Sequence, residues 1–164
     1  MPSTEIQVAG FGGQGVILAG IIIGKAACLH EGKYATLTQS FGPEARGSAC
    51  SAQLIVSDEP VLYPYLIRPH ILVAMSQEAY RRFSPNLRQD GLLVLEEDLV
   101  EPEKLADGVR VHKIPATRLA EELGRRLVLN IVMVGFFTAV TSLLGSEAAK
   151  KAELTLFLPR KIST

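Results

Sequence analysis

The chain has 164 residues, the length of one ordinary domain and enough to enclose a hydrophobic core. Its 17 Lys and Arg balance 17 Asp and Glu, and only 21% of the residues are charged against 48% that are hydrophobic. A nucleic-acid surface needs a basic stripe, so that class of protein is excluded. A neutral and sparsely charged chain favours association with other polypeptides instead.

Cysteine and histidine are scarce. Cys28 and Cys50 lie far apart and predict free thiols in a reducing compartment. Two cysteines cannot hold an iron–sulfur cluster, which normally takes four thiolates, so no cluster is expected on this chain alone. The three histidines stand singly, and no metal site is expected.

Targeting and membrane signals are weak. The first five residues carry no basic region and lead into a strand pattern, so we expect no signal peptide. The longest apolar stretch, 128–144, is shorter than a membrane span and is interrupted by polar residues. We therefore expect a cytoplasmic protein that contacts neither membrane nor nucleic acid.

Strand and helix patterns alternate along the chain. Apolar or alternating runs predict strands at residues 5–9, 34–39, 49–57, 70–75, 92–95 and 109–114. Helical patterns are expected at residues 16–29, from 76 onward, at 115–123, 130–143 and 146–153, with an irregular segment or short helix at 61–68. This order predicts an α/β fold, a Rossmann-like and mostly parallel sheet with helices on both faces, as a single domain over residues 1–164.

Two details of this pattern are specific enough to test. The helix at 16–29 is apolar nearly all round, so it should be covered on more than one side. Ser76 precedes its helix at the position of an N-cap.

A glycine loop lies between the first strand and the first helix. Gly10, Gly12 and Gly15 fit the GxGxxG pattern in the strand–loop–helix context that the pattern requires. Glycines allow a tight turn and a close approach to the backbone, and the helix that follows offers free N–H groups and a positive dipole end. The loop therefore suits an anion such as a pyrophosphate.

The residues leave three interpretations of this loop open. A dinucleotide would need an acid at the end of the second strand, which here ends in Gln39 and Ser40, while Glu31 precedes that strand at the opposite end. A tight turn used only for packing or for docking another chain is the second interpretation, and another anionic ligand is the third. An ATP loop of the Walker type is excluded, because no Lys-Ser/Thr pair follows Gly15.

A second loop follows the second strand. It reads FGPEARG at residues 41–47 and carries Glu44 and Arg46 two positions apart. Arg46 could bind a carboxylate or phosphate in a bidentate manner at the edge of the sheet where the glycine loop lies. Alternatively, Glu44 and Arg46 pair with each other or across a subunit boundary.

Three segments together carry a resemblance to a known family. GFGGQG at 10–15, FGPEARG at 41–47 and LNIVMVG at 129–135 resemble the gamma subunit of 2-oxoacid:ferredoxin oxidoreductases, over about residues 4–145. SFGPEARG at 40–47, read with DEP at 58–60, favours the 2-oxoglutarate type over the pyruvate type. His70 stands where this family is expected to have Asp.

The resemblance implies a non-catalytic subunit of a larger enzyme. That enzyme decarboxylates a 2-oxoacid to an acyl-coenzyme A and passes electrons to ferredoxin. Thiamine diphosphate, Mg²⁺ and iron–sulfur clusters would be held by alpha, beta and ferredoxin-like partner subunits, and no cofactor would bind stably to this chain alone. Coenzyme A is the ligand implied for the candidate site, which comprises Gly10, Gly12, Gly13, Gln14, Gly15, Glu44 and Arg46.

The apolar helices at 16–29 and 128–144 are then expected to contact other subunits, and a homodimer is possible for the isolated chain. We expect the isolated chain to be inactive. Two other hypotheses remain: a stand-alone Rossmann-type nucleotide-binding enzyme, and a structural assembly module whose glycine loop binds nothing soluble.

Overall fold

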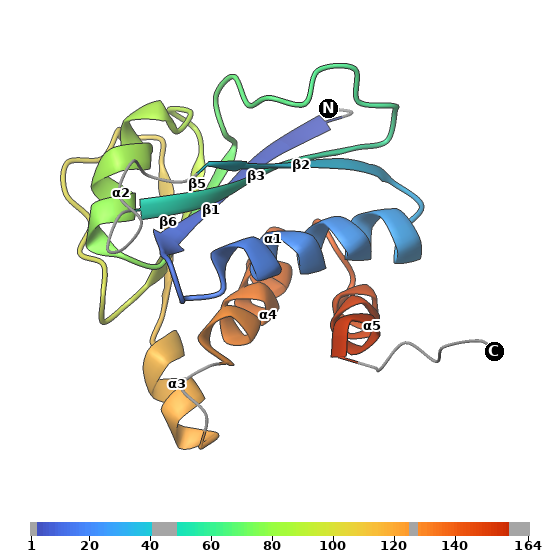
Figure 1. Cartoon of the computed structure of the whole chain (residues 1–164). Coiled ribbons are helices and arrows are strands. Elements are labelled where there is room, and N and C mark those ends of the chain that lie inside the picture. Colours follow the sequence, from blue (N-terminus) through green and yellow to red (C-terminus); the bar gives the residue numbers. More distant parts are fainter. Residues whose placement is uncertain (1–2, 41–48, 125–127, 158–164) are drawn as a thin grey trace.

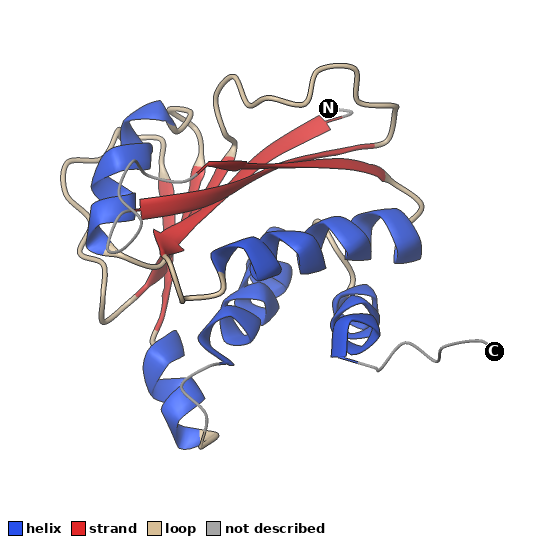
Figure 2. Ribbon diagram, viewed as in Figure 1, coloured by secondary structure: helices blue, strands red, loops and turns tan. Residues whose placement is uncertain are grey.

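A computed structural model of the chain describes residues 3–40, 49–124 and 128–157. Within these residues six strands form one sheet in the order β2-β3-β1-β4-β5-β6 (Figures 1 and 2). In chain order the strands are β1 (Ser3–Phe11), β2 (Tyr34–Ser40), β3 (Ala49–Ser57), β4 (Ile71–Ala74), β5 (Leu92–Glu96) and β6 (Arg110–Ile114).

One strand runs against the others. β1 pairs with β4, β4 with β5 and β5 with β6 in parallel, whereas β3 is antiparallel to both β1 and β2. The chain between Ser40 and Ala49 is too short for the crossover that two adjacent parallel strands need. β2 and β3 therefore form a hairpin, and the mostly parallel sheet that we expected contains this one antiparallel strand.

Helices cover both faces of the sheet, as expected. They are α1 (Val16–Lys25), the π-helical turn η1 (Ala26–His30), α2 (Gln77–Phe83), the short 3₁₀ turn η2 (Ser84–Asn86), α3 (Ala116–Glu122), α4 (Leu129–Thr141) and α5 (Ser146–Phe157). α1, α4 and α5 lie on one face, where Ile6 and Val8 of β1 enter the larger core (Figure 1). α2 packs on the other face, where Tyr80 meets Leu72 and Leu93 in a second core.

Helix α1 is enclosed from two sides. It lies between the sheet and the pair α4 and α5 (Figure 1). Val16, Ile22 and Ile23 are almost completely buried there. The expectation that an all-round apolar helix would be covered on more than one side is confirmed.

Most predicted elements are present. The strand at 49–57 has the predicted bounds, and the Ala79 N–H donates to Ser76 Oγ at 3.1 Å, which confirms the N-cap. β3 is buried along nearly its whole length, although the sequence predicted an alternating strand, because helices cover the sheet on both sides. Residues 61–68 are irregular, and among the described helices none is long and apolar enough to cross a bilayer.

Candidate functional site

The glycine loop lies at the carboxyl edge of the parallel strands. β1 ends at Phe11 and α1 begins at Val16, so residues 12–15 turn the chain from the sheet into the helix (Figure 1). Phe11, Gly12 and Gly13 are exposed. The predicted strand–loop–helix arrangement is present, with its turn open to solvent.

Gln14 fixes the shape of this turn. Its backbone N–H donates to the Phe11 carbonyl at 3.2 Å, and its side-chain Oε1 accepts the Phe11 N–H at 2.7 Å. Its Nε2 donates to the carbonyl of Met75, which directly follows β4, at 2.9 Å. Both ends of the Gln14 amide are therefore used inside the protein, where they tie the loop to the neighbouring strand.

Two of the glycines are required by internal packing. A Cβ on Gly10 would lie 2.4 Å from Gln14 Oε1, and a Cβ on Gly15 would lie 2.4 Å from Asn130 Nδ2. Gly15 also has φ 75°, a left-handed conformation that L side chains rarely adopt. The Asn130 Nδ2 donates to the Gly15 carbonyl at 3.4 Å, so α4 supports the start of α1.

The other two glycines face open space. A Cβ on Gly12 or Gly13 would meet no described atom within 4 Å. Gly13 has φ 93° and so needs glycine for its backbone, whereas Gly12 has no positive φ. Neither the backbone conformation nor a described neighbour requires glycine at position 12.

The second predicted loop lies outside the described residues, and Glu44 and Arg46 with it. Its two ends are described: Ser40 ends β2 and Ala49 begins β3. Ala49 pairs directly with Phe11, at the edge where the glycine loop starts. The ends of this loop therefore lie at the same edge of the sheet as the glycine loop.

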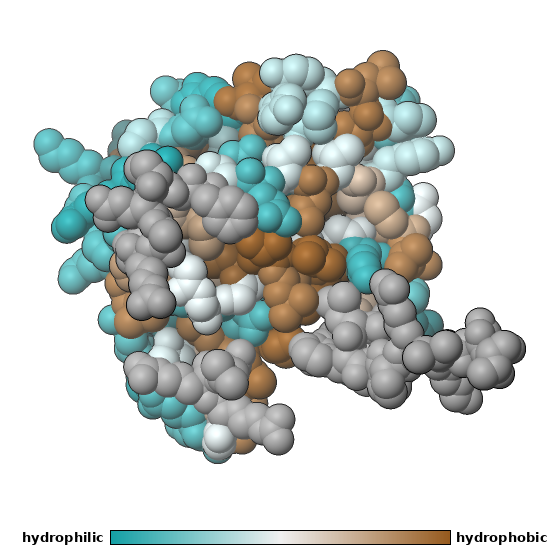
Figure 3. Space-filling view, viewed as in Figure 1, coloured by the Kyte–Doolittle hydropathy of each residue, from teal (hydrophilic) through white to brown (hydrophobic). Residues whose placement is uncertain are grey.

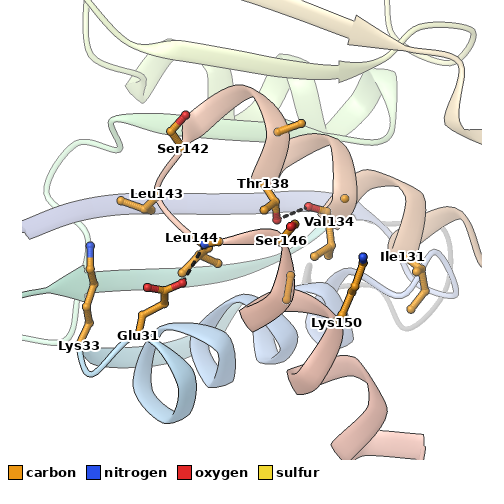
Figure 4. Close-up of a pocket in the computed structure, with 14 residues that line it drawn as sticks. Glu31, Lys33, Ile131, Val134, Thr138, Ser142, Leu143, Leu144, Ser146 and Lys150 are labelled. Atoms are coloured by element: carbon orange, nitrogen blue, oxygen red, sulfur yellow. Dashed lines mark hydrogen bonds between the residues drawn. The ribbon is translucent and has the colours of Figure 1, made fainter.

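Glu31 is engaged elsewhere. Its Oε1 accepts the Gly145 N–H at 2.8 Å and so holds the connection between α4 and α5. It lines a cavity of about 620 Å³ bounded by α4, α5 and the chain after η1 (Figure 4). Lys33 and Lys150 also lie around this cavity, and none of the described residues of the predicted site does. Glu31 is thus not available as the ribose-binding acid of a dinucleotide site.

The cysteines show no metal-binding arrangement. Cys50 is paired with Gly10 across β1 and β3, and burial raises the pKa of its thiol, which keeps it neutral. Cys28 is exposed on η1. In the part of the chain that the structure describes, no cluster of three or more His, Cys, Asp or Glu side chains suits a metal ion.

Sequence reasoning missed two supports of the site. Asn130 appears in the sequence analysis only as part of the apolar stretch 128–144 and of LNIVMVG at 129–135, without a role of its own, but it is buried against Gly15. The signal was available, because an amide inside an apolar helix needs a hydrogen-bond partner. The Met75 carbonyl, which receives the Gln14 side chain, gives no signal in the sequence because any residue offers a carbonyl.

Fold and site together define a class of protein. It is a Rossmann-like α/β domain with an exposed glycine turn at the carboxyl edge of its sheet, where such folds bind ligands. Residues 5–161 match the family described as "Pyruvate ferredoxin/flavodoxin oxidoreductase", and the chain belongs to this family.

Three relatives place the chain within that family. It is 46% identical over 152 residues to "2-oxoglutarate synthase subunit KorC" of Methanocaldococcus jannaschii, covering 92% of this chain and 81% of that protein. It is 32% identical over 139 residues to "Ketoisovalerate oxidoreductase subunit VorA" of Methanothermobacter thermautotrophicus, covering 85% of this chain but only 28% of VorA. The solved gamma subunit of a keto/oxoacid ferredoxin oxidoreductase from Geobacter sulfurreducens PCA matches with a TM-score of 0.82 and 37% identity, over 95% of this chain and 87% of that one.

These findings confirm the resemblance and the α/β fold class predicted from the sequence. The relatives are subunits of oxidoreductases that act on 2-oxoacids, which agrees with the predicted enzyme class.

Proposed function

We propose that the chain is the gamma subunit of a multisubunit 2-oxoacid:ferredoxin oxidoreductase and that its foremost substrate is 2-oxoglutarate. The KorC relative at 46% identity supports this choice of 2-oxoacid. Alpha, beta and ferredoxin-like chains are the proposed partners, and they would carry thiamine diphosphate, Mg²⁺ and the iron–sulfur clusters. The two cysteines of this chain, one of them buried, agree with that division, because a cluster needs four thiolates.

We also propose that the glycine loop holds the pyrophosphate of coenzyme A within the assembled enzyme. Coenzyme A supplies the thiol that accepts the acyl group. Gly12 and Gly13 expose bare backbone directly before α1, and the first amides of that helix carry its positive dipole end. The observation that carries this proposal is the open space around Gly12, where a side chain would meet nothing described and would obstruct a ligand.

The remaining predicted residues have supporting roles. Gln14 and Gly15 shape the turn through their bonds to Met75 and Asn130. Glu44 and Arg46 are proposed to reach the same ligand from the neighbouring loop, whose ends flank the site. The proposed setting is a single-domain subunit in the cytoplasm.

The test uses the complex reconstituted from this chain and its alpha, beta and ferredoxin-like companions. We expect reduction of ferredoxin to depend on 2-oxoglutarate and coenzyme A, with pyruvate a poorer substrate and this chain inactive alone. The Gly12→Val variant should assemble normally and raise the KM for coenzyme A by at least about tenfold, because a side chain then fills the space for the pyrophosphate. A complex that assembles with an unchanged KM for coenzyme A would remove the loop from the site.

One observation favours a second candidate, a loop that docks another chain. Phe11 lies beside the glycines with 36% of its surface exposed, and an apolar side chain on the turn suits a protein partner. If Gly12→Val weakens assembly but the complex that still forms keeps the original KM for coenzyme A, the loop is a docking element.

A further inference from the structure

The connection between β3 and β4 exposes large apolar side chains. We call residues 61–67, which are neither helix nor strand, the apolar strap. Leu62 is 95% exposed, Ile67 72%, Tyr63 60% and Tyr65 57%. The strap crosses the end of the sheet opposite the glycine loop (Figure 1), and on that side of the surface hydrophobic residues alternate with pale and hydrophilic ones (Figure 3).

The fold holds this strap in place. The buried carboxylate of Glu5, only 8% exposed, accepts the Ile67 N–H through Oε1. Its Oε2 accepts a hydrogen bond from Arg88 Nη2 at 3.5 Å, and Arg88 Nε donates to the Arg68 carbonyl at 3.1 Å. Burying a carboxylate is costly, yet here it fixes the backbone of a segment whose side chains lie in water.

The strap is also stiffened from within. Pro60, Pro64 and Pro69 each lock one backbone dihedral in or beside it. The rings of Tyr63 and Tyr65 meet edge to face with centroids 5.6 Å apart. A surface that is ordered before binding loses less entropy when a partner arrives.

The exposed area is large for this size of protein. With 150–250 Å² for each large side chain, the four residues expose roughly 500 Å² of mostly apolar surface. Patches of that size on soluble proteins commonly mark sites of interaction. The neighbouring edge strand adds Tyr34, 49% exposed and paired with Ser57 immediately before the connection.

We propose that the apolar strap is the surface on which a companion subunit of the same enzyme docks. That companion is the polypeptide that corresponds to the rest of the longer relatives. In VorA the matching region is 28% of one chain, so the domain is joined covalently to further polypeptide of the same enzyme. In KorC, which this chain covers to 81%, the domain is nearly the whole subunit, and attachment has to come from a surface.

The area of the strap indicates how much more surface its occupant has to cover. A stable interface takes about 800 Å² from each partner, and the strap alone offers less. A companion subunit therefore has to extend beyond the strap onto neighbouring surface such as β2. This inference rests on the proposed function, because only a subunit has a companion to bind.

The experiment measures affinity for the companion chain with two variants matched in chemistry. Leu62→Asp changes the strap, and Leu123→Asp changes an equally apolar residue, 72% exposed, at the end of α3. Each full-length variant is titrated against the purified companion chain that corresponds to the remainder of VorA, and its thermal midpoint is measured. We expect Leu62→Asp to weaken binding at least about 30-fold without a change in thermal midpoint, and Leu123→Asp to bind like the original chain.

The outcomes distinguish a failure of the proposed function from a failure of the strap inference. If the original chain does not bind the companion, the proposed function fails. If it binds and Leu62→Asp binds equally well, only the strap inference is overturned. A self-association of the original chain that Leu62→Asp abolishes, with companion binding intact, would assign the strap to a second copy and overturn the inference as well.

Discussion

The two ends of the sheet present opposite kinds of surface. At the carboxyl edge, the glycine loop exposes backbone without side chains. Hydrogen bonds from the side chains of Gln14 and Asn130 hold this loop in place. At the other edge, the apolar strap exposes Leu62 and Tyr65. The buried carboxylate of Glu5 holds the strap by accepting a hydrogen bond from its backbone. In both places buried polar contacts fix a segment that does little for the core.

The difference teaches what each edge can bind. Bare amides at a helix start attract a small anionic ligand, and a ligand of that kind needs no large apolar area. Exposed leucine and tyrosine side chains gain free energy only when a second apolar surface removes them from water. On the proposed assignments the molecule has a ligand edge and a docking edge, and the following variants test whether the two are separate.

The largest expected effect is a difference in the free energy of unfolding between variants at Gly15 and at Gly12. Gly15→Ala combines a positive φ with a Cβ placed 2.4 Å from Asn130, and it should lower the free energy of unfolding by about 2–4 kcal/mol. A Cβ in Gly12→Ala meets no described atom and the position has no positive φ, so the free energy of unfolding should change by no more than about 0.5 kcal/mol. Urea denaturation of both variants checks this. Equal losses would mean that Gly12 is also structural, which would remove the main support for the ligand edge.

A smaller loss is expected at the anchor of the strap. Glu5→Gln removes the charge that pairs with Arg88 and should cost about 1–3 kcal/mol in the free energy of unfolding. Hydrogen exchange at residues 61–67 should become faster as the strap loosens. Glu97→Gln, which breaks an exposed pair with Arg118, serves as the control and should cost less than about 1 kcal/mol. A strap whose exchange is unchanged in Glu5→Gln would show that the anchor is elsewhere.

The smallest effect concerns pH. Burial, with a further contribution from Arg88, lowers the pKa of His70, whose Nδ1 accepts the Glu5 N–H at 2.9 Å. The folded state therefore takes up the His70 proton at lower pH than the unfolded state, whose histidine titrates near pH 6.5. This contribution to stability is complete above about pH 6.5 and is lost as the pH falls from there through the lowered pKa.

The measurement compares the free energy of unfolding between pH 7.5 and pH 5 for the original chain and for His70→Asn. Asparagine can accept the same hydrogen bond without titrating, so the variant should lose less stability over this range. Parallel curves would exclude His70 as the source.

Much of the fold was predictable because local signals and tertiary structure agree. Strand 49–57, the Ser76 cap and the glycine turn each follow from residues close together in the sequence. A mostly parallel sheet was predicted without a direction for β3, although the short connection from Ser40 to Ala49 already requires a hairpin.

The site was predictable in part, for the same reason. The positions of the glycines predict a loop, but the sequence does not show which glycines are required by internal packing and which are exposed to solvent. That division depends on Asn130, more than a hundred residues further along the chain. The exposure of the strap could not be predicted from the sequence either. Leucine and isoleucine usually lie in a core, and only the tertiary structure shows that Leu62 and Ile67 are exposed. The parts of the prediction on Glu44 and Arg46 stay predictions.

Hydrogen exchange of the assembled enzyme, with and without coenzyme A, tests the separation of the two edges most directly. Docking of the companion chains should slow exchange at residues 61–67, and coenzyme A should then slow exchange only at the glycine loop and the first turn of α1. If coenzyme A leaves residues 12–17 unprotected in an active complex, the ligand edge is wrongly assigned and the account fails.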